Sequence, residues 1–147
     1  MADNVNLARS LYEAWNERNF DRLAELITPD GKITVVGSGD TFEGPEGARK
    51  YDLMWAEAFP DGSITVDNVI AADDYVVVEF TGRGTHTGTL EGPGGSIPAT
   101  GRSVTLQLCD VLQFSDGKVR SQRTYLDGAS LLAQLGVTAE QAATTQQ

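Results

Sequence analysis

The sequence predicts a single α+β domain shaped as a cone, in which three to four helices cover one face of a curved antiparallel sheet. Up to Phe59, apolar residues recur at intervals of three to four, which is typical of amphipathic helices. From Ser63 to Asp127 the chain consists of strand-like runs separated by short turn sequences. This order places the helices on one side of the sheet, and the space between the two layers predicts a pocket.

Three helices are predicted before the long strands. The first spans residues 4–19, with Asp3 or Asn4 as its N-cap, and the second begins at Phe20. A short strand over residues 33–36 follows the predicted turn at Asp30-Gly31. The third helix begins at Gly44-Pro45, because proline suits the first helical turn, and ends at Phe59.

Four long strands and a last helix follow. The strands are expected at residues 64–71, 75–87, 104–114 and 119–126, and the helix at residues 128–135. The segment 91–101 is rich in Gly and Pro, which predicts a mobile loop that would serve as a lid. Residues 139–147 have no apolar stripe and are predicted to form a disordered tail, so the domain is expected to span residues 1–138.

Composition excludes several classes of partner. A net charge of −10 argues against a nucleic-acid surface and against binding to anionic membranes. The single cysteine, Cys109, excludes an intrachain disulfide and is expected to be a buried thiol. One histidine and one cysteine cannot form a zinc site, and no phosphate loop, dinucleotide fingerprint or nucleophile elbow is present, so neither a metal nor a cofactor is expected. Without a signal peptide or a long apolar run, the expected location is the cytoplasm.

Four motifs in order carry a resemblance to a known family. They are Phe59-Pro60-Asp61, Gly84-Thr85-His86-Thr87-Gly88, Asp116-Gly117-Lys118-Val119, and Tyr125-Leu126-Asp127 followed by Leu131-Leu132-Ala133-Gln134-Leu135-Gly136. Over residues 4–136 the chain resembles the SnoaL-like polyketide cyclases, or ester cyclases, of the nuclear transport factor 2-like (ketosteroid isomerase-like) superfamily. The resemblance implies cofactor-free ring closure by intramolecular aldol condensation inside the cone. It also implies an aspartate general acid/base, which carries over to Asp127.

Strand alternation supports the assignment of Asp127. It places Asp127 on one face together with Val119, Ser121, Arg123 and Tyr125, at the edge of a partly apolar cavity. Burial there would raise the pKa of the carboxyl group and suit it to proton transfer near neutral pH. The alternative is structural, because Asp127 also stands where the last helix needs an N-cap.

Three further residues are candidates for the catalytic site. Arg123 would stabilise an oxyanion, or form a structural ion pair with Asp127. Gln107 shares a strand face with Thr105, Cys109 and Val111 and would donate a hydrogen bond to the same oxyanion; as an amide it cannot transfer a proton. His86 is the only histidine and titrates near neutral pH, the alternative being a structural hydrogen bond at the strand end.

Aromatic and long apolar side chains are the candidates for substrate contacts. Tyr12, Trp15, Tyr51, Met54, Trp55 and Tyr125 would line the mouth of the cone, where a flat polycyclic ligand needs aromatic walls. The alternative is that the helical aromatics belong to the core.

The sequence thus favours a cofactor-free enzyme that acts on a hydrophobic, polyketide-like carbonyl compound. The alternatives are a water-adding hydrolase or hydroxylase of the same fold, and a non-catalytic module that binds a ligand or dimerises. A homodimer is expected, formed through a strand face that carries Val76 and Val78 or one that carries Leu106, Leu108 and Leu112.

Overall fold

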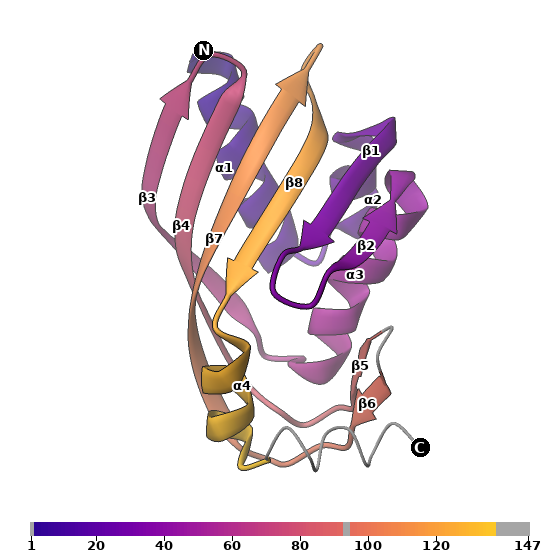
Figure 1. Ribbon diagram of the computed structural model, residues 1–147, viewed down its shortest axis with the longest axis vertical. Helices are drawn as coiled ribbons and strands as arrows, with labels where there is room; N and C mark the ends of the chain where they lie inside the picture. The colour runs from indigo at the N-terminus through magenta and orange to yellow at the C-terminus, as the bar shows by residue number, and fades with distance from the viewer. Residues whose placement is uncertain (1, 93–94, 138–147) are drawn as a thin grey trace.

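A six-stranded curved sheet with four helices forms the body of the molecule (Figure 1). The computed structural model describes residues 2–92 and 95–137. The predicted tail at residues 139–147 and the last position of the expected domain, residue 138, lie outside the described residues.

The elements follow one another in a simple order. They are α1 (Ala2–Asn16), α2 (Phe20–Glu25), β1 (Ile27–Val35), β2 (Asp40–Glu43), α3 (Gly44–Ala58), β3 (Ser63–Ala72), β4 (Tyr75–Thr85), β5 (Leu90–Gly92), β6 (Gly95–Ile97), β7 (Ser103–Ser115), β8 (Lys118–Leu126) and α4 (Gly128–Leu135). The helices and the four long strands therefore lie within a few residues of their predicted positions. The predicted turn at Asp30-Gly31 is wrong, because both residues lie inside β1, where its pairing with β8 is irregular.

The sheet is mixed, which corrects the prediction of an antiparallel sheet. Its strand order is β2-β1-β8-β7-β4-β3. All neighbours pair in antiparallel fashion except β1 and β8, which run parallel. No hairpin joins these two strands, so no turn imposes an antiparallel direction on them, and their shared direction cannot be read from local sequence.

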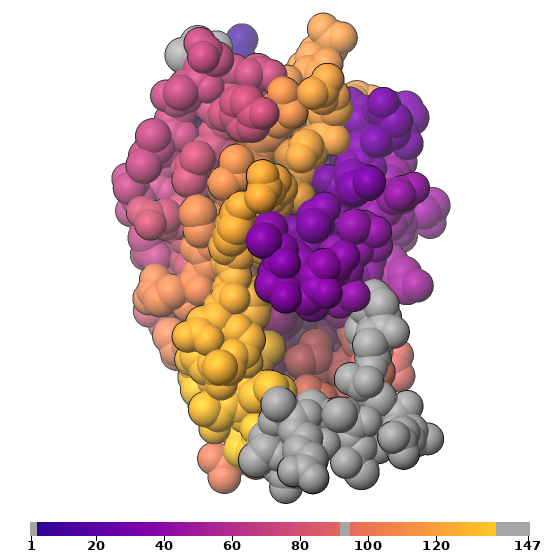
Figure 2. All heavy atoms as spheres, viewed as in Figure 1, coloured from indigo at the N-terminus to yellow at the C-terminus, as the bar shows by residue number. Residues whose placement is uncertain are grey.

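One face of the sheet is covered and the other is open. In Figure 1 the strands lie in front of α1, α2 and α3, and we call the face toward these helices the inner face. Buried residues on the inner face of β7 alternate with exposed ones such as Thr105 and Gln107 on the outer face. Figure 2 presents the outer side, where side chains of β3, β4, β7 and β8 form the surface.

The two apolar strand faces proposed for a dimer both point inward. Val76, Val78 and Leu112 are fully buried, and they belong to the cluster that packs against Ala8 and Tyr12 of α1. The expectation that one of these faces is exposed for dimerisation is therefore wrong, whereas the dimer itself stays a prediction.

Two local features add to the sequence predictions, whereas the mobility of residues 91–101 and their role as a lid stay predictions. Within the segment 91–101, strands β5 and β6 pair with each other, and β5 packs against α3, although residues 93–94 are outside the described part. Cys109 is half-buried rather than buried, because it lies on the outer face of β7. In the described chain, no helix is long and apolar enough to span a membrane.

Candidate active site

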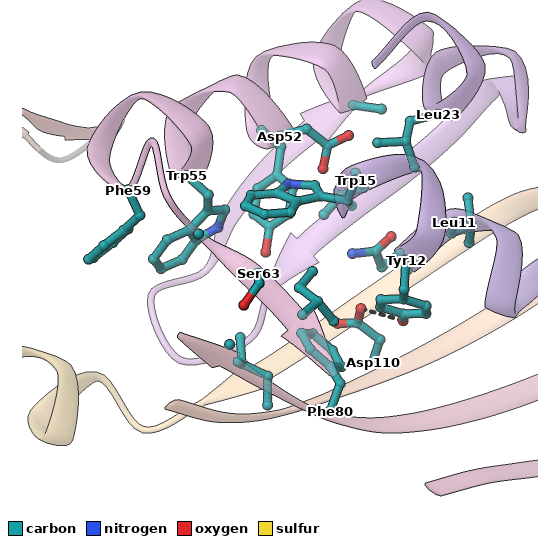
Figure 3. Close-up of a pocket in the computed structure, with 18 of the residues that line it drawn as sticks. Leu11, Tyr12, Trp15, Leu23, Asp52, Trp55, Phe59, Ser63, Phe80 and Asp110 are labelled. Carbon is teal, nitrogen blue, oxygen red and sulfur yellow. Dashed lines mark hydrogen bonds between the residues drawn. The ribbon is translucent and has the colours of Figure 1, made fainter. Parts of the chain in front are cut away.

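A partly open cavity of about 130 Å³ lies between the helices and the inner face of the sheet (Figure 3). Side chains from α1, α2 and α3 form one wall, and β1, β3, β4, β7 and β8 form the other. Most of the lining is apolar, which excludes water from much of the space and strengthens any polar interaction inside. The polar side chains that reach the cavity include Tyr12, Tyr51, Asp52, Ser63, Asp110 and Gln122.

Four of the six predicted substrate-contact residues line this cavity: Tyr12, Trp15, Tyr51 and Trp55. Met54 instead lies beside a shallow surface groove with Phe42 and Arg49, because it stands about 100° around the helix from Trp55. Tyr125 is 38% exposed and is not among the residues that line the cavity.

Asp110 is a buried carboxylate on the inner face of β7. Its side chain accepts two hydrogen bonds of 2.7 Å, one from the hydroxyl of Tyr12 and one from that of Thr124. Burial raises the pKa of Asp110 to about 6, although both hydrogen bonds act in the opposite direction by stabilising the charged form. Asp110 is therefore held in a fixed orientation and changes charge close to neutral pH.

A second carboxyl group, Asp52, reaches the cavity from α3. Figure 3 shows Asp52 beside Trp15 on the helix side, whereas Asp110 lies between Tyr12 and Phe80, closer to the strands. Burial raises the pKa of Asp52 well above its usual value, and the negative charge of Asp110 adds to this effect. Among the described residues, neither carboxyl group takes part in an ion pair. Burial thus raises the pKa of both carboxyl groups, and the charge of one group raises the pKa of the other.

A chain of hydrogen bonds connects the cavity to Asp110 from β8. Gln122 lines the cavity and its Nε2 donates to the hydroxyl of Thr124 at 3.1 Å, and Thr124 in turn donates to Asp110. Thr124 is fully buried, so its hydroxyl cannot exchange this partner for bulk water. Burial and the charge of Asp110 also raise the pKa values of Tyr12 and Tyr51, which keeps both phenols protonated.

The prediction that Asp127 and Arg123 face the cavity is wrong. Between Val119 and Ser121, β8 uses two residues where β7 uses one, so Arg120 is the extra residue of a β-bulge. The bulge reverses the alternation, and Gln122 and Thr124 point inward in place of Arg123.

Asp127 takes the structural role that was its alternative. It is the N-cap of α4, and its Oδ1 accepts a hydrogen bond from the backbone N–H of Ser130 at 3.0 Å. Arg123 is exposed and lies over the ring of Tyr125, with 5.6 Å between its guanidinium carbon and the ring centroid. No ion pair joins Arg123 to Asp127 in the part of the chain that the structure covers.

Gln107 and His86 also lie outside the cavity lining. Gln107 shares a face with Thr105 and Cys109 as predicted, but this is the outer face, where its side chain is exposed. His86 is fully buried, and its Nδ1 accepts a hydrogen bond from the backbone N–H of Thr100 at 3.1 Å. Burial lowers the pKa of His86, so the ring is neutral and makes the structural contact proposed as its alternative.

The two carboxyl groups of the cavity did not emerge from the motifs, although each leaves a trace in the sequence. Asp110 alternates with Leu106, Leu108 and Leu112, so it is a charged residue on an otherwise apolar strand face. Asp52 lies four residues after Ala48, on the apolar stripe of α3. An acidic residue on a buried face is costly unless the site uses it.

Comparison with known proteins shows the family and the fold of the chain. The model of the SnoaL-like polyketide cyclase family matches residues 5–135. No curated protein matches the chain by sequence. Three solved structures illustrate the similarity at the level of the whole chain.

IdmH of Streptomyces antibioticus, a candidate polyketide cyclase, is 30% identical, with a TM-score of 0.74 over 91% of this chain and 99% of IdmH. AclR of Streptomyces galilaeus, a candidate hydroxylase, is 27% identical, with a TM-score of 0.77 over 92% and 97% of the two chains. A Catenulispora acidiphila protein with a ketosteroid isomerase-like fold is 21% identical, with a TM-score of 0.75 over 91% and 95%. The fold is therefore that of the ketosteroid isomerase-like proteins.

Proposed function

Because the chain belongs to the SnoaL-like polyketide cyclase family, we propose that it is a cofactor-free enzyme acting on a hydrophobic, polyketide-like carbonyl compound. Its reaction would be an intramolecular aldol cyclisation or a related isomerisation, driven by aspartate general acid/base catalysis. The observation that carries this proposal is the pair of carboxyl groups, Asp110 and Asp52, in one apolar cavity without a cationic partner among the described residues.

The two carboxyl groups suit different roles. Two acids whose environments separate their pKa values can serve as base and acid at the same pH. Above about pH 6, Asp110 is ionised and takes a proton from the carbon beside the substrate carbonyl. Asp52, whose pKa burial raises well above its usual value, would in its protonated form donate a hydrogen bond to the resulting enolate oxygen.

Ring closure completes the sequence without a further reagent. The enolate carbon attacks a second carbonyl group of the same molecule, so one carbon–carbon bond forms and the second oxygen becomes an alkoxide. The proton held by Asp110 then moves to this alkoxide, which restores both aspartates to their starting states. Positioned proton transfer contributes about 10²–10⁴-fold to such a reaction. The walls formed by Trp15, Trp55 and Phe80 supply orientation and exclude water.

The test is turnover of a panel of polycyclic ketones and methyl esters, followed by mass spectrometry. Wild type is compared with Asp110→Asn and Asp52→Asn, and Asp127→Asn is the matched control because it changes a carboxylate outside the cavity. Conversion should fall by about 10²-fold or more in Asp110→Asn and remain in the control. Full turnover in Asp110→Asn would falsify the proposal, and unchanged ligand bound by all four proteins would indicate a binding module instead.

Water addition is the second candidate function, and the similarity to AclR favours it. In this reaction Asp110 would orient and deprotonate a water molecule that attacks the substrate, for instance an epoxide. Incorporation of ¹⁸O from labelled water into the product separates the two functions, because aldol cyclisation leaves the mass of the oxygen atoms unchanged.

A further inference from the structure

The floor of the cavity lacks side chains at one end of β4. The inner face of β4 carries Val76, Val78 and Phe80, and then two glycines, Gly82 and Gly84. Both glycines line the cavity. Glycine inside a strand weakens it and commonly marks a bulge, a bend, or the close approach of a backbone or a ligand.

Packing accounts for Gly84. A Cβ atom at this position would lie 2.9 Å from the Cβ atom of Phe59, closer than side chains tolerate. Gly62, on the loop opposite, is similar, because its Cβ atom would lie 2.9 Å from the carbonyl oxygen of Phe59 and 3.1 Å from the ring of Trp15. These two glycines let the chain pack closely around two residues of the cavity wall.

Neither close packing nor an irregularity of the strand explains Gly82. A Cβ atom there would contact only Cδ1 of Leu108, at an ordinary distance of 3.5 Å. The pairing of β4 with both neighbours is unbroken at this position, where Gly82 lies opposite Ile64 and Leu106. Gly82 is also absent from the glycines with positive φ, so its backbone is open to any residue. The space above Gly82 is therefore not needed by the protein itself.

We propose that Gly82 determines which substrates fit, because the missing side chain leaves a subsite for an apolar ring remote from the reacting carbonyl. This inference rests on the proposed function for the identity of the substrate and deepens it. Val78 lies opposite Asp110, and Gly82 is four residues further along β4, which corresponds to about 13 Å at 3.3 Å per residue. The subsite thus holds the end of the ring system that does not react.

The surroundings define the chemistry of the occupant. The residues around Gly82 that line the cavity include the apolar Ile64, Phe80, Leu106 and Leu108. Arg83 is also part of the lining, but its side chain is exposed and belongs to the opposite face of β4. The charge on Asp110 disfavours an anionic ligand in the same cavity. A flat, uncharged ring is the group that these features accommodate.

The size of the cavity makes the position sensitive. Its volume of about 130 Å³ is close to the roughly 150 Å³ of an engineered cavity in another protein that binds benzene. The isopropyl group of a valine at position 82 would occupy a large share of this space. A substitution here should consequently alter ligand size selection without disturbing the fold.

The experiment compares two neutral ketones that differ by one ring, acetophenone and 2-acetylnaphthalene, by isothermal titration calorimetry. Wild type, Gly82→Ala and Gly82→Val are measured, and Gly84→Ala serves as the contrasting glycine variant. In Gly82→Val, the affinity for 2-acetylnaphthalene should fall by about tenfold or more, and that for acetophenone by less than about threefold. Thermal unfolding should be unchanged or shifted upward in Gly82→Ala and shifted downward in Gly84→Ala.

Three results would overturn the inference. They are an equal loss of affinity for both ketones, binding of neither ketone to wild type, and a lower unfolding temperature for Gly82→Ala, which would mean that the glycine serves the curvature of β4. Neither ketone can undergo intramolecular aldol closure, so the assay measures binding alone. Repeating it in an Asp110→Asn background separates the two proposals, because the size selection should persist there even if the acid/base mechanism fails.

Discussion

An aspartate lies on the inner face of β7 and another follows the end of β8, and the two carboxylates have different roles. On the inner face, Asp110 is buried and receives hydrogen bonds from the hydroxyls of Tyr12 and Thr124. At the outer end of β8, Asp127 is exposed and accepts a backbone N–H at the start of α4. One carboxylate is set up to change its charge, and the other stabilises a helix end. The environment rather than the residue type decides the role.

The difference between the faces should appear most strongly in how stability depends on pH. Folding raises the pKa of Asp110 from 3.8 to about 6, so the folded protein binds this proton more tightly than the unfolded chain. This contribution to stability is fully present below about pH 4 and is lost as pH rises through about 6. Two pKa units correspond to about 3 kcal/mol of unfolding free energy, and Asp52 acts in the same direction.

Urea unfolding of wild type and Asp110→Asn at intervals from pH 4 to 7 measures this contribution. The stability of the variant relative to wild type should increase with pH across the range. Parallel curves for the two proteins would show that Asp110 does not titrate as its burial predicts.

The second-largest effect is expected when Asp110 loses one of its two hydroxyl hydrogen-bond donors. Thr124→Val removes a hydrogen bond to the charged carboxylate, worth about 2 kcal/mol. The pKa of Asp110 should rise by about one unit, because the charged form loses more than the neutral form. Carboxyl-carbon titration by NMR measures the shift, with Thr124→Ser as the control that retains the donor. An unchanged titration in Thr124→Val would contradict this account.

A smaller effect is expected at the outer carboxylate. Asp127→Ala removes the N-cap of α4 and should lower the free energy of unfolding by about 1 kcal/mol. Asp127→Asn should keep most of the stability, because asparagine caps helices nearly as well. Chemical denaturation at neutral pH compares the two variants. Equal losses in both would mean that the charge, and not the cap, matters here.

The smallest effect should come from the exposed side chain of Gln107. Gln107→Ala should change the free energy of unfolding by less than about 0.5 kcal/mol and leave turnover unchanged. Denaturation and the mass-spectrometric turnover assay measure both quantities. A clear loss of turnover would mean that the outer face contributes to the reaction.

The helices and hairpins could be predicted because apolar periodicity and turn residues lie within or next to each element. The apolar stripe after Gly44-Pro45 gave the third helix, and Ser115-Asp116-Gly117 gave the hairpin between β7 and β8. The direction of β1 against β8 was not predictable, since it depends on contacts between distant parts of the chain. The short strand β2 was missed for the same reason: only its pairing with β1 defines it.

The site was harder to predict than the fold, and one residue explains much of the error. Strict alternation from Val119 puts Arg123 and Asp127 on the cavity side. The bulge at Arg120 reverses that order, and no glycine or proline at this position announces it. The faces of β7, whose pairing with β4 is unbroken, were grouped correctly, yet which face is inner depends on helix packing that the pattern does not contain.

The parallel pairing of β1 with β8 has a consequence for how the protein forms during synthesis. The cavity is lined by Ile27 and Ile33 from the start of the chain and by Val119 and Gln122 from near its end. Proteins emerge from the ribosome N-terminus first, at about 5–20 residues per second. The early helices and β1 must therefore wait, with their apolar faces uncovered, until β8 has been made. The cavity therefore cannot be complete before β8 has been made, and a chain that ends before β8 lacks Val119 and Gln122 from the cavity wall.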